Sequence, residues 1–169
     1  MRHIFAPWRI RYILMPKHKG CIFCDFPAAK NDEKNLILYR GKKSFIIMNK
    51  YPYNPGHLMI APYRHVGEIE DLTSDEQIDL FYCLKLSILA IKSALKPDGL
   101  NIGINIGKVA GAGVKDHLHI HVVPRWNGDT NFMPVLADVK VIPEALEETY
   151  KKLRESISAL TDEASTGSH

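Results

Sequence analysis

The sequence predicts an α+β domain, in which an antiparallel sheet is crossed by a long helix and joined by a C-terminal helix. Three observations lead to this prediction. Several short runs alternate apolar and polar residues, as half-buried strands do. A turn that contains Gly joins the first two runs as a hairpin. One long helical pattern then separates the early runs from the late ones.

The first half of the chain contains three predicted strands. Residues 36–39 and 45–49 flank Gly41 and form the hairpin. Segment 50–56 is rich in Pro, Asn and Gly, so we expect a loop there. Residues 57–61 form the third strand.

Two helices are predicted from their end signals and their apolar periodicity. Thr73 and Glu76 have the spacing of a capping box, and the helix they open runs to about Leu95. Pro143 suits the first turn of a last helix, whose apolar residues recur at four-three spacing up to Leu160.

The segment between these helices contains two more predicted strands. Residues 100–106 alternate Leu or Ile with Asn or Gly. A loop of small residues at 107–113 then leads to a last strand at 117–123. Pro124 cannot donate to a strand ladder, so we expect the strand to end there.

The last predicted strand carries three histidines. His117, His119 and His121 alternate with apolar residues, so all three rings share one face at spacings of ~7 Å. An imidazole can act as nucleophile, proton carrier or metal ligand near neutral pH. A strand with three rings on one side is therefore expected to form a chemical site.

Length and composition indicate one globular domain. We assign residues 1–160 to it, and we expect the polar residues 161–169 to be a disordered tail. Residues 1–20 form a basic arm without Asp or Glu, which either contacts phosphates or is simply solvated. No apolar run approaches the ~20 residues that cross a bilayer. With a net charge of +3, the chain indicates neither a membrane nor a nucleic acid partner.

The cysteines are too few for a disulfide scaffold. Cys21 and Cys24 form a Cys-x-x-Cys pair, which in a reducing compartment indicates metal binding or redox chemistry. We therefore expect a cytoplasmic protein. Cys83 lies within an apolar helical pattern and is expected in the core.

Several residues around the histidines suit nucleotide chemistry. Gly111 and Gly113 flank backbone N–H groups that could hold a phosphate without obstruction by side chains. Asn49 and Asn105 stand at strand ends, where amides can bind ribose hydroxyls, although Asn49 also suits a simple turn. Trp126 could stack on a base or cover the core. A neutral His119 aimed at phosphorus would be a plausible nucleophile.

These motifs resemble the histidine-triad (HIT) family of nucleotide hydrolases and transferases. The resemblance rests on His-x-His-x-His at 117–121, Asn-Pro-Gly-His at 54–57 and Pro-Tyr-Arg-His at 62–65. The segments Ala-Pro-Trp-Arg at 6–9 and Pro-Arg-Trp-Asn-Gly-Asp-Thr-Asn-Phe-Met-Pro at 124–134 look like the bacterial diadenosine tetraphosphate phosphorylase branch.

The resemblance implies roles for the histidines. His119 would attack the α-phosphorus and form a nucleotidyl-histidine intermediate, which phosphate or water would resolve. His121 would contact phosphate oxygens, and His57 would support the triad. His117 would fix the strand.

The resemblance also implies a nucleotide pocket. Asn49 stands where the family places a ribose-binding Asp or Asn. Asn105, Gly113 and Val114 would line the pocket, the last two through the main chain. Relatives often have a hydroxyl or amide donor at the position of Val114, so protonation of the leaving group has no obvious side chain here.

A structural zinc is a further implication, with no organic cofactor. Relatives bind it through positions that match Cys21, Cys24, His65 and His117. The alternative is a reduced thiol pair with His65 as an ordinary loop residue. Family members also pair their sheets across a two-fold axis, so a homodimer, or a tetramer built from dimers, is expected.

Three other functions remain open at this stage. A nucleoside phosphoramidase would share the intermediate but accept an amine leaving group. A metallohydrolase would hold a catalytic zinc in the triad itself. A nucleotide-binding module would bind adenine nucleotides without turnover.

Overall fold

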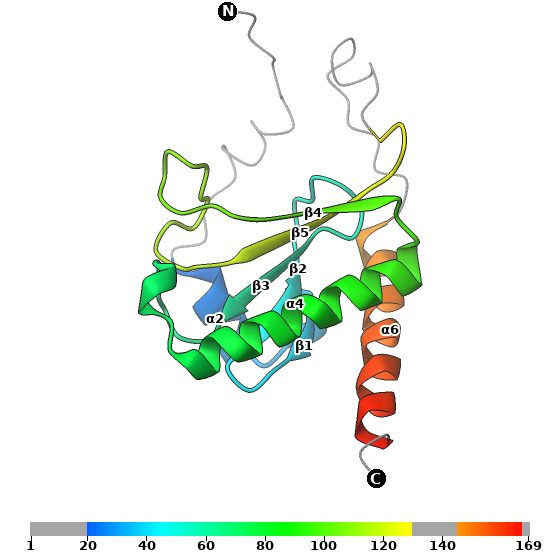
Figure 1. The fold of residues 1–169 in the computed structure, drawn as a ribbon, viewed down its shortest axis with the longest axis horizontal. Coiled ribbons are helices and arrows are strands. Elements are labelled where there is room, and N and C mark those ends of the chain that lie inside the picture. Colours follow the sequence, from blue (N-terminus) through cyan, green and yellow to red (C-terminus); the bar gives the residue numbers. More distant parts are fainter. Residues whose placement is uncertain (1–19, 130–144, 167–169) are drawn as a thin grey trace, which may run out of the picture.

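The computed structural model describes residues 20–129 and 145–166, and its centre is one antiparallel sheet. The strands lie in the order β1-β2-β3-β5-β4 (Figure 1). Their bounds are Ile37–Arg40 for β1, Ser44–Met48 for β2, Leu58–Pro62 for β3, Gly99–Ile104 for β4 and Ile120–Arg125 for β5. The predicted α+β fold is confirmed.

Helices cover both faces of the sheet. The long helix α4 (Ser74–Leu95) crosses one face, where it packs against β2, β3 and β5, and α6 (Leu146–Thr166) lies beside it (Figure 1). On the other face lies the short helix α2 (Ile22–Ala28). Two single turns, α3 (Asp32–Asn35) and η1 (Ile69–Asp71), complete the described elements.

The core divides into two clusters because neighbouring side chains of a strand point to opposite faces. Ile46 and Met48 of β2 join the cluster under α4 and α6. Phe45 and Ile47 of the same strand join a smaller cluster around Phe23 of α2. All residues of β2 and β3 are buried, so these strands form the middle of the domain.

The predicted signals of the long helix are confirmed. The Thr73 hydroxyl accepts from the backbone N–H of Glu76, whose carboxylate accepts from the backbone N–H of Thr73. The helix ends at Leu95, and Lys96 follows with φ +47°, a left-handed conformation that stops the helix. Cys83 is fully buried in the core under this helix, as expected.

The boundaries of the last strand were predicted wrongly. β5 begins at Ile120 rather than at 117, and it continues through Pro124 to Arg125. The pairing of β5 with β3 stops at Val122 opposite Leu58, so Pro124 lies beyond the end of β3. On that side of β5, the carbonyl of Pro124 accepts a hydrogen bond from the side chain of Asn54 instead. The nitrogen of Pro124, which carries no hydrogen, faces the same side, so the pairing of β5 with β4 loses no hydrogen bond.

The end of the chain also differs from its prediction. α6 continues to Thr166, so residues 161–166 are helical rather than a disordered tail. The Thr161 hydroxyl donates to the carbonyl of Ile157, and a helix can continue past its last apolar residue on backbone bonds alone. Pro143, residues 1–19 of the basic arm, residues 130–134 and residues 167–169 lie outside the described residues. None of the described helices has both the length and the apolar character that a bilayer span requires.

We predict that Gly56→Ala lowers the free energy of unfolding by about 1–3 kcal/mol. Gly56 has φ +76°, and an added Cβ would lie 2.3 Å from Cδ1 of Leu95. Gly99→Ala is the matched control, since its Cβ would meet nothing within 4 Å. Urea unfolding of both variants tests this, and equal losses would contradict it.

Candidate active site and metal cluster

The predicted face of histidines is present on the sheet side opposite α4. Leu118, Ile120 and Val122 point into the core under α4. The rings of His119 and His121 lie edge to face with centroids 4.8 Å apart. Only 4% of His119 is exposed, whereas His121 is half-buried.

The hydrogen bond of His119 determines where its proton lies. Nδ1 is 2.8 Å from the carbonyl oxygen of His117. A carbonyl only accepts, so Nδ1 carries the proton and Nε2 keeps its lone pair. Burial lowers the pKa of His119 below its ordinary value, which keeps the ring neutral at pH 7. Phe23 packs against this ring with centroids 4.7 Å apart.

The same reasoning applies to His57 and His121. The backbone N–H of Tyr53 donates to His57 Nδ1 over 3.2 Å, so the His57 proton sits on Nε2. His57 Nε2 then donates to His121 Nδ1 over 2.9 Å. His121 therefore carries its proton on Nε2, the nitrogen left for a ligand. Burial, and then repulsion from His119 when that ring is protonated, lower the pKa of His121 to about 4.

A turn of defined type delivers His57 to this position. The N–H of His57 donates to the carbonyl of Asn54, with Pro55 and Gly56 between them. A type II turn favours Pro at its second position and a Gly with positive φ at its third, and this turn has both. The side chain of Asn49 also contacts the site: its Nδ2 lies 3.3 Å from His57 Nδ1, and its Oδ1 accepts from the N–H of Tyr51.

A cavity of about 450 Å³ opens beside His121. Asn105 lines it as well, but His119 does not. Among the lining residues that the sequence did not single out are Tyr53, Asn101 and Arg125. Because side chains alternate along β4 and β5, Asn101 and Arg125 lie on the same face of the sheet as His121. This alternation is the sequence signal that could have identified them. Tyr53 lies in a turn, where periodicity gives no signal.

The small-residue loop differs from the expected phosphate cradle. The N–H of Gly111 donates to the carbonyl of Lys108, and the N–H of Ala112 donates to the carbonyl of Gly107. These two N–H groups are therefore already used. Gly111 still lies beside Asn105, because an added Cβ would be 3.9 Å from Asn105 Nδ2.

Two other predicted pocket residues lie away from the lining. Val114 packs against the apolar cluster around Phe23. Trp126 follows β5, and its backbone N–H donates to Asp129 Oδ2. Neither residue is among those that line the cavity. The binding roles of Gly113, Val114 and Trp126 stay predictions.

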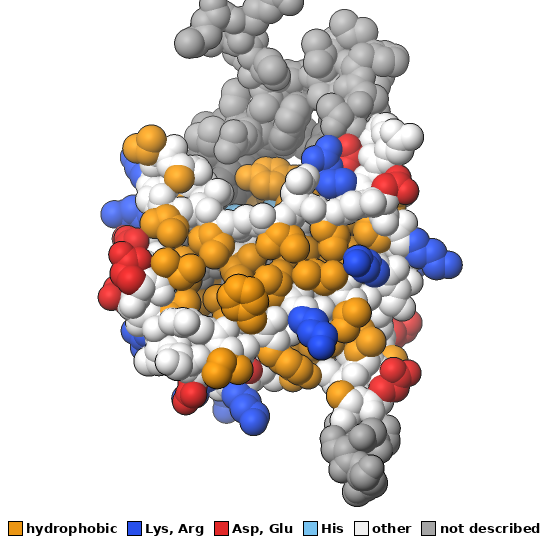
Figure 2. Space-filling model, in the orientation of Figure 1, with side chains coloured by type: hydrophobic (Ala, Val, Ile, Leu, Met, Phe, Trp, Pro, Cys, Tyr) orange, Lys and Arg blue, Asp and Glu red, His pale blue; other side chains and the backbone are white. Residues whose placement is uncertain are grey.

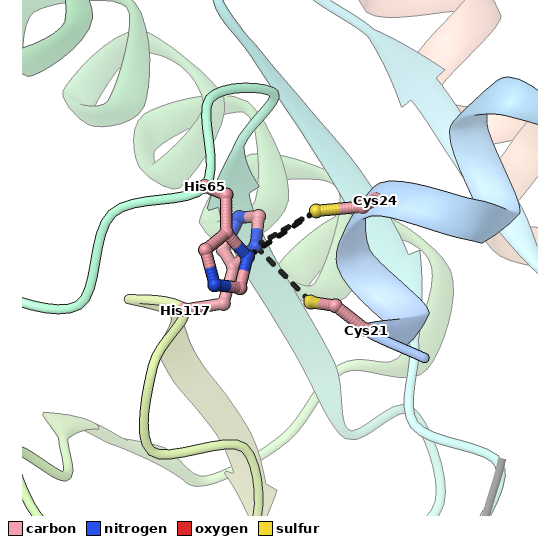
Figure 3. Close-up of side chains that lie close together, drawn as sticks. All are labelled: Cys21, Cys24, His65 and His117. Carbon is pink, nitrogen blue, oxygen red and sulfur yellow. Dashed lines mark hydrogen bonds between the residues drawn. The ribbon is translucent and has the colours of Figure 1, made fainter. Parts of the chain in front are cut away.

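His117 belongs to a different group of side chains from His119 and His121. Its ring lies with Cys21, Cys24 and His65, and the ligand atoms of all four are within 4.8 Å of one another (Figure 3). His117 Nε2 donates to the carbonyl of Pro62 over 2.8 Å, which leaves the Nδ1 lone pair toward Cys21 Sγ at 3.2 Å. The His117 ring thus lies on the same face as His119, where Phe23 packs against both rings, but its Nδ1 points to the cysteines.

These four residues fit a tetrahedral metal site. Bond lengths for zinc place a thiolate sulfur and an imidazole nitrogen about 3.6 Å apart across the ion. The pairs here are 3.2 to 3.5 Å apart. The bond from His117 Nε2 to a carbonyl is the usual outer support of a metal-bound histidine.

An ion pair anchors the segment that presents His65. Arg64 donates to both carboxylate oxygens of Glu76, which also caps α4, and to the carbonyl of Asp71. The hydrogen bond from Arg64 holds the pKa of Glu76 at about 2, far below its usual value. The loop before His65 is therefore attached to the start of the long helix.

Comparison with known proteins identifies the family. The profile of the HIT domain matches residues 30–128. The chain belongs to the HIT family. A HIT relative in Mycobacterium tuberculosis named AP-4-A phosphorylase is 40% identical over 162 residues, which cover 90% of this chain and 83% of the relative.

Solved HIT structures agree with the fold. A hypothetical histidine triad nucleotide-binding protein from Sulfolobus tokodaii is 33% identical with a TM-score of 0.68, and the match covers 83% of this chain and 94% of the other. A Zn-bound HIT protein from Mycobacterium smegmatis is 26% identical with a TM-score of 0.69, over 85% and 96%. The matched HIT segment contains His65 and His117 but begins after Cys21 and Cys24.

We predict that acid destabilises this HIT protein partly through His121. The pKa of His121 is about 4 in the folded chain and near 6.5 when unfolded, so only the unfolded chain binds this proton between those values. The free energy of unfolding should therefore fall as pH falls from about 6.5 to 4. His121→Asn should show a shallower fall in urea titrations, and a parallel one would contradict the prediction.

Proposed function

We propose that this protein transfers a nucleotidyl group from dinucleoside polyphosphates through an intermediate on His119. The observation that carries the proposal is the placement of protons at the two central rings. His119 Nε2 has a lone pair, and His121 Nε2 has a hydrogen to donate. A nucleophile and a donor for phosphate oxygens are thus adjacent, with ring centroids 4.8 Å apart.

The reaction proceeds in two displacements. His119 Nε2 forms a bond to the α-phosphorus while the bond to the bridging oxygen breaks, and the nucleoside polyphosphate leaves with that electron pair. Phosphate or water then attacks the same phosphorus and releases His119. Diadenosine tetraphosphate would give ATP in the first step, followed by ADP with phosphate or AMP with water. The neutral His119, held so by burial, is ready to attack.

The surrounding residues have supporting roles in this proposal. His121 Nε2–H stabilises charge on the phosphate oxygens, and His57 holds that proton in place. Asn49 and Asn105 bind ribose and phosphate through their amides. Gly113 and Val114 contribute the main-chain donors that remain after Gly111 and Ala112 have bonded within their own loop. Trp126 stacks on a base.

The histidine geometry argues against a metallohydrolase that holds zinc in the triad. His117 Nδ1 points to the cysteines, His119 Nδ1 bonds the His117 carbonyl and His121 Nδ1 bonds His57. The three rings therefore do not converge on one position. A phosphoramidase shares the first displacement, and an amine leaving group would distinguish it.

We also propose that Cys21, Cys24, His65 and His117 hold a structural zinc ion. The donor set and its spacing support this, as does the Zn-bound relative. An ion there would fix the start of the His119 segment to α2. The described cysteines are all free thiols, which suits a cytoplasmic location.

A homodimer, or a tetramer built from dimers, is the proposed assembly. β4 is an edge strand and exposes 46% of Ile102. Phe81 and Ile78 of α4 are exposed by 66% and 70%, and apolar side chains gather over this face (Figure 2). The outer edge of β4 pairs with no other described strand, and such an edge next to an apolar face supports pairing of two copies.

We predict that His119→Ala abolishes formation of an adenylylated protein and lowers turnover of diadenosine tetraphosphate by about 10³-fold or more. The measurement mixes protein and substrate with and without phosphate, separates the products and locates the modified residue by mass spectrometry. ADP with ATP indicates phosphorolysis, and AMP with ATP indicates hydrolysis. Undiminished cleavage by the variant would contradict the mechanism. Absence of cleavage in the wild type, with tight nucleotide binding, would favour a binding module.

We predict that Cys24→Ala loses bound zinc whereas Cys83→Ala keeps it. Cys24 Sγ lies 3.4 Å from His65 Nδ1, while Cys83 is buried in the core under α4. Elemental analysis of the purified proteins measures the metal, and a chelator should lower the melting temperature only where zinc is present. Equal zinc content in both variants would overturn the assignment.

A further inference from the structure

A single carboxylate joins the turn after β5 to the turn that presents His57. Asp129 Oδ2 accepts from Asn54 Nδ2 at 2.8 Å, from Arg125 Nε at 2.6 Å and from the N–H of Trp126 at 3.1 Å. Its Oδ1 accepts from Arg125 Nη2 at 2.8 Å. Only 12% of the Asp129 side chain is exposed. Such a partly buried, fourfold acceptor holds its partners far more firmly than a surface ion pair.

Asn54 connects the Asp129 carboxylate to the active site. Its Nδ2 donates to the carbonyl of Pro124 at 2.9 Å as well as to Asp129, and its own carbonyl accepts the N–H of His57. The preceding N–H, that of Tyr53, donates to His57 Nδ1. The Asn54 side chain thus helps to hold the turn in which the Tyr53 N–H reaches His57.

The hydrogen bond from the Tyr53 N–H to His57 influences which nitrogen of His121 carries a proton. While the Tyr53 N–H occupies His57 Nδ1, His57 must donate from Nε2, and His121 must accept at Nδ1. Without the Tyr53 bond, His57 Nδ1 would keep only the longer contact with Asn49 Nδ2 at 3.3 Å, so the form of His57 with its proton on Nδ1, which accepts at Nε2, would become more populated. His121 would then donate from Nδ1 and present a lone pair at Nε2. A lone pair there repels phosphate oxygens, whereas the N–H attracts them.

We propose that Asp129 is a positioning residue that keeps His57 and His121 in the tautomers with protons on Nε2. It acts through Asn54 and the turn at 53–57 and touches neither ring. The kinetic consequence rests on the proposed function, because it assumes that His121 donates to a phosphate. The tautomers themselves do not depend on any substrate.

The carboxylate is required because each of these four bonds has Asp129 as its acceptor. Arg125 is held on its other side by Asn101, to which its Nη1 donates at 2.7 Å, so the guanidinium cannot turn away. In Asp129→Asn, an amide NH₂ would face either Asn54 Nδ2 or the guanidinium of Arg125. A donor would then meet a donor, and the contact with Asn54 would weaken at nearly unchanged side-chain volume.

Asp98→Asn is the matched control. Asp98 accepts from the N–H of Asn127 at 2.7 Å and so stabilises the same turn, but its side chain does not bond Asn54. Asn54→Ala tests the contact from the other side and replaces Asp129→Asn if that variant does not fold.

The experiment measures ring ¹⁵N shifts of His57 and His121 by NMR in the full chain without substrate. We expect protons on Nε2 of both rings in the wild type and in Asp98→Asn, and mixed tautomers in Asp129→Asn and in Asn54→Ala. The double variant should show no larger change than either single variant, because both break one contact. Unchanged tautomers in Asp129→Asn, at a retained fold, would overturn the proposal.

Kinetics supply the second readout. If about a tenth of the molecules keep the competent tautomer, kcat/KM for diadenosine tetraphosphate falls about tenfold in Asp129→Asn. A fall in melting temperature alone, with tautomers and kcat/KM unchanged, would show a purely structural role and overturn the proposal. A wild type that cleaves no dinucleoside polyphosphate would overturn the proposed function, yet the ring shifts would still decide the role of Asp129.

Discussion

The hydrogen bond from His57 Nε2 to His121 Nδ1 is the contact on which the active site depends. It joins the residue before β3 to the second residue of β5, and the pairing of these two strands brings the two nitrogen atoms within 2.9 Å of each other. Because each neutral imidazole has one donor and one acceptor, this bond makes the proton positions of the two rings interdependent. The sheet therefore sets not only where His121 lies but also what it can offer to a phosphate.

Burial favours the neutral state of the three histidines at 117, 119 and 121. His117, His119 and His121 all have pKa values below the ordinary range, with burial as the largest cause. A neutral ring at His119 keeps the lone pair that a nucleophile needs, and a neutral ring at His117 suits a metal ligand. One run of alternating residues thus serves two different centres, the cavity beside His121 and the cluster with Cys21 and Cys24.

The sequence predicted most of the fold because its signals are local. Alternation around His119 placed the rings on one face, and Thr73 with Glu76 placed the start of α4. The errors came from non-local facts. Pro124 continues the strand only because its neighbour β3 has already ended, and the N–H of Gly111 is used by a carbonyl within its own loop. Neither fact is visible in residue types.

The site was predictable to a similar extent. The histidines and the cysteine pair stood out by spacing and by family resemblance, whereas Asn101 and Arg125 required the register of β4 on β5. Asp129 illustrates the limit. A short polar residue in a turn is ordinary, and only the folded chain shows that it bonds to Asn54, which is far from it in sequence.

The ion pair between Arg64 and Glu76 has a consequence for how an ion could reach the cysteine cluster. Glu76 caps α4 and also bonds Arg64, the residue before His65. Displacement of this segment therefore breaks a contact to the first turn of the helix. If the cluster holds the proposed zinc ion, its entry and exit would be coupled to fraying of the first turn of α4.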